Sequence, residues 1–439
     1  MKLTNINLLS KDIIALNGHP QDYAPLLDKI KDANVVLLGS ASHGTNECYQ
    51  MRAEITQHLI REKGFHAIAI EGDWTAAYKI NTYVKDKDKS VSKFKALASF
   101  DHFPSWIWCN KVMLEFITWL RAYNDRTTIH PIKVGLYGLD LYSLDSSIHV
   151  VLDYLDKLNS DVAAEVRKRY QSLYHQSEDP LHYALSADKG LIPNCSEDLL
   201  THLVSLLQSR LYDMQDPVLD HEELLFIHQN AKVISNAEAY YRLLLKQPEV
   251  LWNFREEHML ETLEDLRKHY QHILGFTPKI VVWAHNMHVA NVASPNTIQK
   301  KRTTLGQLIK KNYQTNCYTV GFTIYTGEVT TASQWGGFTE NRNIRPAPQV
   351  SYESIFHQLN IPKFLLFLNK ETPLPKHSLQ RAMGAIYREN KYINYYYSSY
   401  LSLEYNVVIH IDVTTPLAPL HEVHGWKKVD LPRTYPTGF

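Results

Sequence analysis

Two short apolar runs on either side of a helical stretch constrain this chain more than any other feature. Val35–Leu38 reads VVLL and Ala67–Ile70 reads AIAI, and the residues between them follow a helical pattern. Apolar runs without polar interruption are typical of strands covered on both faces, as in the parallel sheets of α/β proteins. We therefore predict a strand, a helix and a second strand in one parallel sheet.

The same pattern recurs and predicts a larger sheet. Further β-branched or aromatic runs occur at Lys133–Tyr137, Lys279–Trp283, Tyr318–Ile324, Phe364–Leu368 and Val407–Ile411. Several of the runs lead into a polar residue: Glu71, Asp140, His285, Tyr325, Asn369 and Asp412. Ligands of open α/β sheets bind at the carboxyl edge of the strands, where these residues would lie. The predicted fold class is α/β, with three layers around a mostly parallel central sheet.

The strand signal disappears in the middle of the chain. Residues 146–275 carry apolar side chains at helical spacing, as in HVVLDYLDKL and MLETLEDLRKHYQHIL. We interpret this region as a helical cap insertion that packs against the sheet. The predicted domains are an α/β core of residues 1–145 and 276–439 and a helical cap of residues 146–275.

Composition narrows the classes of partner. Of 439 residues, 46 are basic and 46 acidic, so no global field favours nucleic acid or a membrane surface. The four cysteines form no CxxC pair, and no stretch approaches the ~20 apolar residues of a membrane helix. The N-terminus lacks the features of a secretory signal. We expect a soluble, cytoplasmic protein with reduced thiols, no nucleic-acid partner and no membrane partner.

Four residues at predicted strand ends can support chemistry. His43 lies between Gly39 and Gly44 in the loop after the first strand, and Glu71 ends the second strand. His285 and His288 follow the apolar run KIVVWA. Each has a structural interpretation: a lone His–Gly turn is more often architectural, and a strand-end carboxylate is often a cap or an ion pair.

If these four residues converge, they form either a hydrolytic site or a divalent-metal site, and spacing alone does not distinguish the two. The candidate metal ligands are His43, Glu71, His285 and His288. Arg52, about two helical turns after His43, would lie on the same side. HExxH, GxSxG, Walker A and GxGxxG motifs are absent, so the usual zincin, serine hydrolase and nucleotide-binding signatures are missing.

Ordered segments across most of the chain resemble the erythromycin esterase family. They include LLGSASHGTNE, GFHAIAIEGDW, FPSWIW, YGLDLYSL, VVWAHNMHVA, GFTIYTGEVTTASQW and IRPAP. The resemblance implies an α/β sheet with a helical cap and hydrolysis of an ester or lactone, as in the macrolide-cleaving members, with antibiotic resistance as a possible consequence. No cofactor is then required, although a divalent metal stays open.

Carried onto this chain, the resemblance makes His43 the general base that activates water, with Glu71 and His285 as partners and Arg52 and His288 close by. Glu71 would hold the imidazole tautomer, and Arg52 or His285 would stabilise the oxyanion. The expected partner is a small-molecule ester or lactone. Candidate substrate-binding residues are Ser40, Trp74, Phe103, Trp106, Trp108 and Arg345.

Two positions depart from the family pattern. Ser40 replaces the Glu of G-E-x-x-H-G, and Cys109 replaces the Arg of W-x-W-R-N. Both changes remove a charge, and we hypothesise that the lost groups were partners, because replacing both members of a buried pair costs far less than replacing one. The alternative function is a catalytically impaired family member that binds a metal or a small ligand.

Overall fold

The computed structural model describes residues 9, 12–127, 132–158, 164, 180–191, 220–247, 249–292 and 294–420. Its centre is a nine-stranded sheet with the order β1-β8-β11-β6-β2-β5-β3-β4, in which β7 also pairs with β6. The strands of this sheet are β1 (Ile13–Ala15), β2 (Val35–Leu38), β3 (Ala67–Asp73), β4 (Gly135–Asp140), β5 (Ile280–Trp283), β6 (Cys317–Thr331), β7 (Glu340–Ile344), β8 (Lys363–Phe367) and β11 (Val407–Thr414). A separate hairpin joins β9 (Ser378–Arg381) to β10 (Tyr396–Ser399).

The strands from β11 to β4 run parallel, and only β1, β7 and β8 pair antiparallel within this sheet. The prediction of a mostly parallel sheet is therefore confirmed. All seven predicted strands form, although β6 extends well beyond the predicted run. The sequence analysis missed β1, β7, β9 and β10. The strand β1 has only three residues, and β7, β9 and β10 lack a continuous apolar run.

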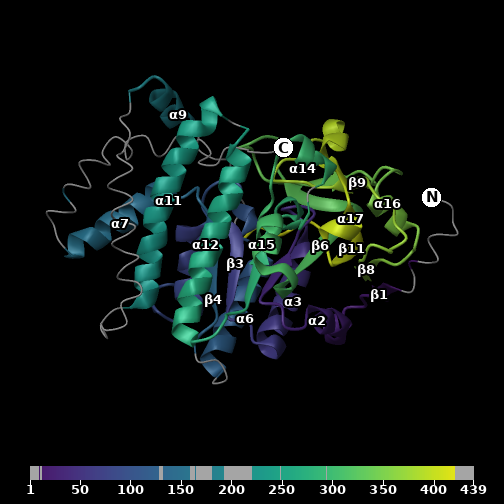
Figure 1. Ribbon diagram of the computed structural model, residues 1–439, viewed down its shortest axis with the longest axis horizontal. Coiled ribbons are helices and arrows are strands. Elements are labelled where there is room, and N and C mark those ends of the chain that lie inside the picture. Colours follow the sequence, from purple (N-terminus) through teal and green to yellow (C-terminus); the bar gives the residue numbers. More distant parts are fainter. Residues whose placement is uncertain are drawn as a thin grey trace.

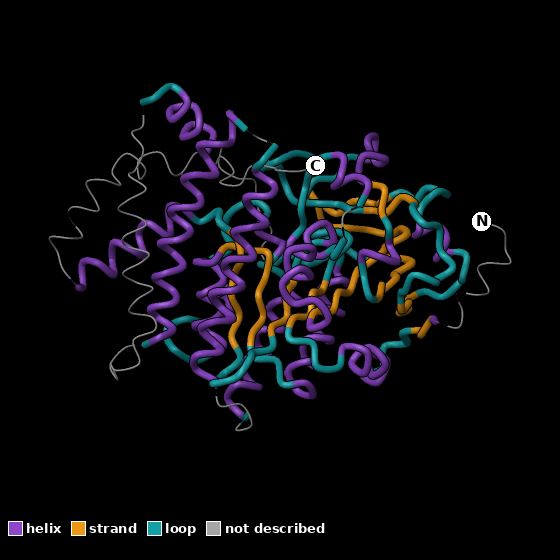
Figure 2. Tube along the Cα trace, viewed as in Figure 1, coloured by secondary structure: helices purple, strands orange, loops and turns teal. Residues whose placement is uncertain are grey.

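Alternate residues of each strand face opposite sides of the sheet and build two cores. Val36 and Leu38 pack with α3 (Asn46–Lys63) and α6 (Lys111–Arg126) on one face. Val35 and Leu37 pack with the other helical layer, which includes α11 (His221–Lys246) and α12 (Leu251–Leu274). This alternation makes the predicted three layers, and Figures 1 and 2 show the sheet between helices.

The remaining helices are α2 (Ala24–Ile30), α4 (Trp74–Val84), α5 (Lys93–Leu97), α7 (Leu144–Leu158), α9 (Pro180–Asp188), α13 (Asn286–Val289), α14 (Pro295–Gln299), α15 (Leu305–Tyr313), α16 (Tyr352–His357) and α17 (Leu401–Glu404). Short 3-10 helices span Pro20–Tyr23, Ser105–Ile107, Gln314–Asn316 and Glu389–Tyr395. Among the described residues, no helix combines the length and apolar character needed to cross a membrane.

The region predicted as a cap supplies α7, α9, α11 and α12, and part of it lies outside the described residues. Figure 1 shows α11 and α12 as two long neighbouring helices in front of β3 and β4. The boundaries of the cap, after residue 145 and at residue 275, stay a prediction.

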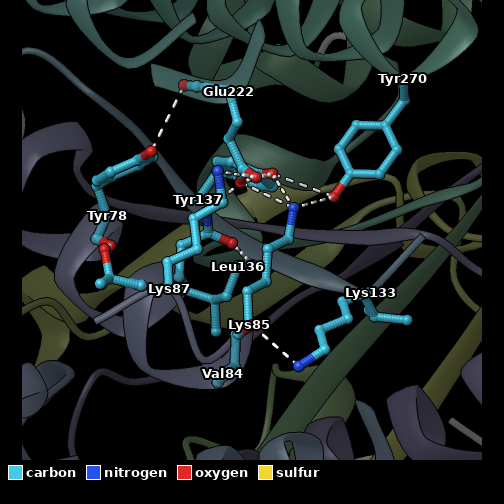
Figure 3. A network of polar contacts seen from close by, with 12 residues as sticks. Tyr78, Val84, Lys85, Lys87, Lys133, Leu136, Tyr137, Glu222 and Tyr270 are labelled. Atoms are coloured by element: carbon cyan, nitrogen blue, oxygen red, sulfur yellow. Dashed lines mark hydrogen bonds and ion pairs between the residues drawn. The ribbon is translucent and has the colours of Figure 1, made fainter. Parts of the chain in front are cut away.

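A buried ionic cluster joins these helices to the sheet (Figure 3). Glu222 of α11 accepts hydrogen bonds from Lys85 at 2.8 Å and from the Tyr137 hydroxyl at 2.9 Å, and Lys87 lies 3.0 Å away. Tyr270 of α12 completes the cluster at 3.1 Å from Tyr137. Burial opposes ionisation of Glu222, but Lys85 and Lys87 outweigh it and hold the pKa of the carboxyl well below its ordinary value.

Candidate active site

Strand order decides which loops meet at the carboxyl edge of the sheet. β5 lies between β2 and β3, so that Trp283 is paired with both Leu38 and Ile70. The loop after β2, the turn after β5 and the end of β3 are therefore neighbours, although the first and second are far apart in sequence. These three segments carry His43, His285 and Glu71.

A cavity that is open to solvent lies over this edge. Its polar lining residues include His43, Glu71, Asp140, Arg255, His285 and His288, and its aromatic lining residues include Phe100, Phe103, Trp108, Tyr142, Trp252 and Trp335. The aromatic residues come from four separate segments of the chain. A ligand that fills this space meets both charged groups and aromatic rings.

The loop that carries His43 is fixed by close backbone contacts. A side chain at Gly44 would lie 1.7 Å from the carbonyl oxygen of Thr330, and one at Gly39 would lie 2.2 Å from Asn286 Oδ1. Only glycine fits at either position. The two glycines thus hold the loop against β6 and α13 and fix the position of His43.

The His43 ring faces the cavity, and no described residue hydrogen-bonds to it. Its centroid lies 5.0 Å from that of His285. Burial lowers the pKa of His43 to about 4, with Glu71 acting against this and His288 and Arg52 adding to it. His43 is therefore a neutral imidazole at pH 7, free to accept a proton from a ligand or water.

His285 is also neutral and presents a defined tautomer. Its Nδ1 accepts a hydrogen bond from the backbone N–H of Met287 at 3.3 Å, so the ring proton sits on Nε2. Burial, together with the neighbouring His43, holds the pKa of His285 well below 6.5. Two neutral histidines therefore stand side by side, one with an available lone pair and the other with an N–H donor.

Glu71 lies at the centre of the charged side of the site. Its Oε1 accepts from Arg255 Nη2 at 2.9 Å and lies 3.2 Å from His288 Nε2, while its Oε2 accepts from the His285 backbone N–H at 2.7 Å. Burial opposes ionisation, but the charges of His288 and Arg255 prevail and hold the pKa of Glu71 well below 4.5. The Glu71 carboxylate thus anchors the turn after β5. In the part of the chain that the structure describes, it makes no hydrogen bond to the His43 ring.

Arg255, which the sequence analysis did not select, reaches the site from α12. Its Nε donates to Asp140 Oδ1 at 3.0 Å and its Nη2 donates to Asp140 Oδ2 at 2.6 Å, in addition to the bond to Glu71. The guanidinium thereby bridges the ends of β3 and β4. Two sequence signals came closest to indicating Arg255. One was Asp140 at a predicted strand end, and the other was the charged run REEH in the helical region, which begins with Arg255 itself.

His288 is held between two carboxylates. Its Nδ1 hydrogen-bonds to Glu256 of α12, and its Nε2 faces Glu71. Burial disfavours the charged ring, but Glu256 and Glu71 raise the pKa of His288 to about 9. Trp252 stacks on the same ring with centroids 4.9 Å apart and planes within 7°.

The structure brings together His43, Glu71, His285, His288, Phe103 and Trp108 around the cavity. Ser40, Arg52, Trp74, Trp106 and Arg345 do not line it. Ser40 lies under the loop and donates to the Ser42 carbonyl at 2.5 Å. Trp74 and Trp106 are core residues, and Arg345 pairs with Glu389 on the surface at 3.0 Å.

Arg52 is buried among aromatic rings instead of at the cavity wall. Its guanidinium carbon lies 4.3 Å from the centroid of Tyr49 and 5.1 Å from that of Trp283. Its Nε and Nη2 have no hydrogen-bond partner among the described residues. A buried cation without a carboxylate is consistent with the loss of the family Glu at Ser40. The hypothesis that positions 40 and 109 once paired stays a prediction.

The candidate metal ligands do not assemble. Among the described residues, no group of three or more His, Cys, Asp or Glu side chains is placed to hold a metal ion. Arg255 and His288 both contact Glu71 Oε1, and the His285 backbone N–H donates to Oε2, so both carboxylate oxygens are already engaged. Whether the protein needs a divalent metal stays a prediction.

The fold and the site define a class: an α/β protein with paired histidines and a buried arginine–carboxylate cluster at the carboxyl edge of its sheet. A sequence model of the erythromycin esterase family matches residues 60–414. The chain belongs to this family, and this membership supports a hydrolase-type function. The matched range includes Glu71, Arg255, Glu256, His285 and His288, and it begins after His43.

Solved structures show the same fold. A Bacillus cereus protein aligns over 95% of this chain and 98% of its own, with 20% identity and a TM-score of 0.76. A succinoglycan biosynthesis protein gives 94% and 98% coverage, 21% identity and a TM-score of 0.73. An erythromycin esterase mutant in its open conformation gives 90% and 95%, with 15% identity and a TM-score of 0.62. Identities this low speak for the fold alone.

Proposed function

We propose that this protein hydrolyses a carboxylic ester or lactone by direct attack of water, with His43 as the general base. The observation that carries the proposal is the neutral His43 ring, which faces the cavity without a hydrogen-bond partner among the described residues. A base must be unprotonated and within reach of its water at the working pH, and this ring meets the first condition throughout the neutral range.

In the attack step, the water oxygen forms a bond to the acyl carbon while His43 takes one water proton. Negative charge develops on the former carbonyl oxygen, and we assign its stabilisation to the Nε2–H of His285, whose ring centroid lies 5.0 Å from that of His43. Such a donor typically contributes ~3 kcal/mol to the transition state. The bond to the leaving oxygen then breaks, and the His43 imidazolium returns its proton to that oxygen to give an acid and an alcohol.

Glu71 takes a different part from the one the sequence suggested. Its oxygens are engaged by Arg255, His288 and the His285 backbone, so it positions the His285 turn instead of holding the His43 tautomer. Arg255 and His288 keep this carboxylate ionised. The charged cluster thus supports the His285 turn.

The aromatic residues that line the cavity support a bulky, largely apolar substrate. Phe103 and Trp335 meet edge to face with centroids 5.0 Å apart, and Trp108 donates its indole N–H to the Glu71 carbonyl at 3.0 Å. Rings held this firmly present a preformed apolar surface. Macrolide lactones, the substrates of the characterised family members, are the first compounds to test.

The test measures hydrolysis of p-nitrophenyl esters of increasing acyl size and of a macrolide panel. We expect His43→Gln to lower kcat/KM by ~10²-fold or more. The control is His58→Gln, because His58 is a histidine of α3 that pairs with Glu62 at 2.5 Å, away from the cavity. Equal activity of wild type and His43→Gln would reject the mechanism.

One observation favours the second candidate, a ligand-binding member with impaired catalysis. The Nε and Nη2 atoms of the buried Arg52 have no hydrogen-bond partner among the described residues, which supports the idea that the carboxylate of the family pattern is missing at Ser40. If no ester or lactone is cleaved, binding of the intact macrolides by calorimetry separates this candidate from an enzyme with an untested substrate. Ser40→Glu should then restore hydrolysis only if the missing charge caused the loss.

A further inference from the structure

Glu256 has no exposed surface and makes two directed contacts. Its Oε1 meets His288 Nδ1, and its Oε2 accepts the backbone N–H of Leu305, the first residue of α15, at 2.6 Å. Each oxygen thus serves one donor. A carboxylate can accept both bonds at once, whereas an amide has only one acceptor oxygen.

The charges around His288 favour a protonated ring. The charged and titratable groups around the His288 ring and its partners come from several elements. They are Glu71 from β3, Asp140 from β4, Arg255 and Glu256 from α12, the neighbouring His43 and His285, and Arg302, which lies on the Trp252 ring. Three of these are buried carboxylates, which favour the charged ring. Arg255 hydrogen-bonds to two of them and acts against the charged ring, because its Nη1 lies 3.2 Å from His288 Nε2. A proton on His288 reduces the net charge of the buried cluster, which a low-dielectric interior requires.

Trp252 and Glu256 fix the ring from two directions. Both belong to the start of α12, one turn apart, and the stack and the hydrogen bond together leave the imidazole one orientation. In that orientation Nε2 points at Glu71 Oε1, which is the oxygen that Arg255 also uses. The orientation of His288 therefore affects the His285 turn through Glu71, which contacts both.

We propose that Glu256 is a positioning residue of the active site, which fixes His288 in the orientation that supports Glu71 and, through Glu71, the His285 turn. The expected effect of Glu256 on ester hydrolysis rests on the proposed function. Its effect on the orientation of His288 rests on the geometry alone. It also makes the start of α12 part of the catalytic architecture.

The substitution Glu256→Gln tests the proposal. In this variant the amide oxygen can still accept the Leu305 N–H, but the NH₂ group then faces His288 Nδ1. We expect the His288 ring to become neutral, with Nδ1 accepting a hydrogen bond from this NH₂ group. The control is Glu353→Gln, because Glu353 is equally buried and its Oε1 accepts a backbone N–H, that of Arg381, at 2.7 Å, but it has no histidine partner. Both variants lose a buried carboxylate, and only one of them touches the site.

Two measurements are made on the full-length protein. Histidine NMR, assigned with His288→Asn, should give a titration midpoint for His288 near 9 in wild type and in Glu353→Gln. In Glu256→Gln the midpoint should fall by at least about one pH unit, a tenfold change in the acid constant. Ester hydrolysis should lose kcat at nearly constant KM in Glu256→Gln, with its alkaline limb moved to lower pH.

A His288 midpoint at or below its ordinary value in wild type would overturn the proposal, even if Glu256→Gln does not fold. An unchanged midpoint in folded Glu256→Gln would overturn it as well. If the midpoint moves as expected while wild type cleaves no ester, the positioning role stands and the hydrolase proposal fails.

Discussion

Replacing Arg255 by Met should destabilise the protein, because two buried carboxylates would lose their shared cation. The side chains of Arg255, Glu71 and Asp140 are 11%, 7% and 4% exposed, and three hydrogen bonds of 2.6 to 3.0 Å join the guanidinium to the two acids. Removing one member of a buried ion pair typically costs ~3–5 kcal/mol, since the remaining charge stays desolvated and unpaired.

The size of the expected shift follows from the length of the chain. An unfolding entropy of about 2.1 cal/mol/K per residue over 439 residues amounts to roughly 0.9 kcal/mol/K. The loss of ~3–5 kcal/mol therefore lowers Tm by about 3–5 °C. Calorimetry or a dye-based melt at pH 7.5 measures this difference.

The matched control is Arg121→Met. Arg121 also bridges two acids, Asp125 at 2.6 Å and Asp86 at 2.8 Å, but its side chain is 24% exposed and the acids are more exposed still. Exposed pairs contribute about 0–1 kcal/mol, so its Tm should change by about 1 °C or less. Equal shifts for the two variants would refute the argument from burial.

The effect should also depend on pH. Because the folded-state pKa of Glu71 lies well below 4.5, this group stabilises wild type above its unfolded pKa, and the contribution is lost as the pH falls towards the folded value. Without Arg255 that pKa rises, so the difference between wild type and Arg255→Met should shrink on acidification. A difference that stays constant from pH 7 to pH 4 would contradict this account.

Three further outcomes are expected. The kcat/KM of wild type should stay level through the neutral range and fall only as the pH drops through about 4, where His43 gains a proton; a midpoint near 6.5 would contradict the lowered pKa. Glu222→Gln should lower Tm by a few degrees, because Lys85 is left buried beside a neutral amide, while ester hydrolysis stays unchanged; lost activity with an unchanged Tm would speak against a purely structural role. Gly44→Ala should fail to fold or lose activity, because the added methyl overlaps the Thr330 carbonyl; a soluble, fully active variant would contradict the observed loop geometry.

The fold was largely readable because its strands are buried on both faces. Continuous runs such as VVLL identified the central strands, since each residue must be apolar whichever face it points to. Edge strands such as β1 and β7 bury fewer residues, so local sequence left them indistinct.

The site was readable only where a strand end marked it. His43 lies in the loop after β2, Glu71 near the end of β3 and His285 in the turn after β5, and topology brings such positions to one edge. Arg255 and Glu256 have no such mark, because on a long amphipathic helix a run of charged residues reads as a solvated face. Their burial depends on how α12 lies against β4.

Aromatic residues illustrate the same limit. Phe103 and Trp106 are close neighbours in sequence and both were expected in the cleft, yet one lines the cavity and the other fills the core. The two rings pack edge to face with centroids 5.3 Å apart, but only the Phe103 ring reaches the cavity. Composition identifies apolar bulk, but backbone direction decides what that bulk faces.

The sequence by itself determined the class of fold, the strand-end histidines and the acid at position 71, because hydrophobic periodicity and chain direction are local properties. Only the tertiary structure decided that β5 lies between β2 and β3, and that α12 delivers Arg255 and Glu256 to the same edge. The protonation states of the site histidines were also decided by the tertiary structure. Whether an imidazole is neutral, as at His43, or charged, as at His288, depends on burial and on the nearest carboxylate, and both are set by residues distant in the chain.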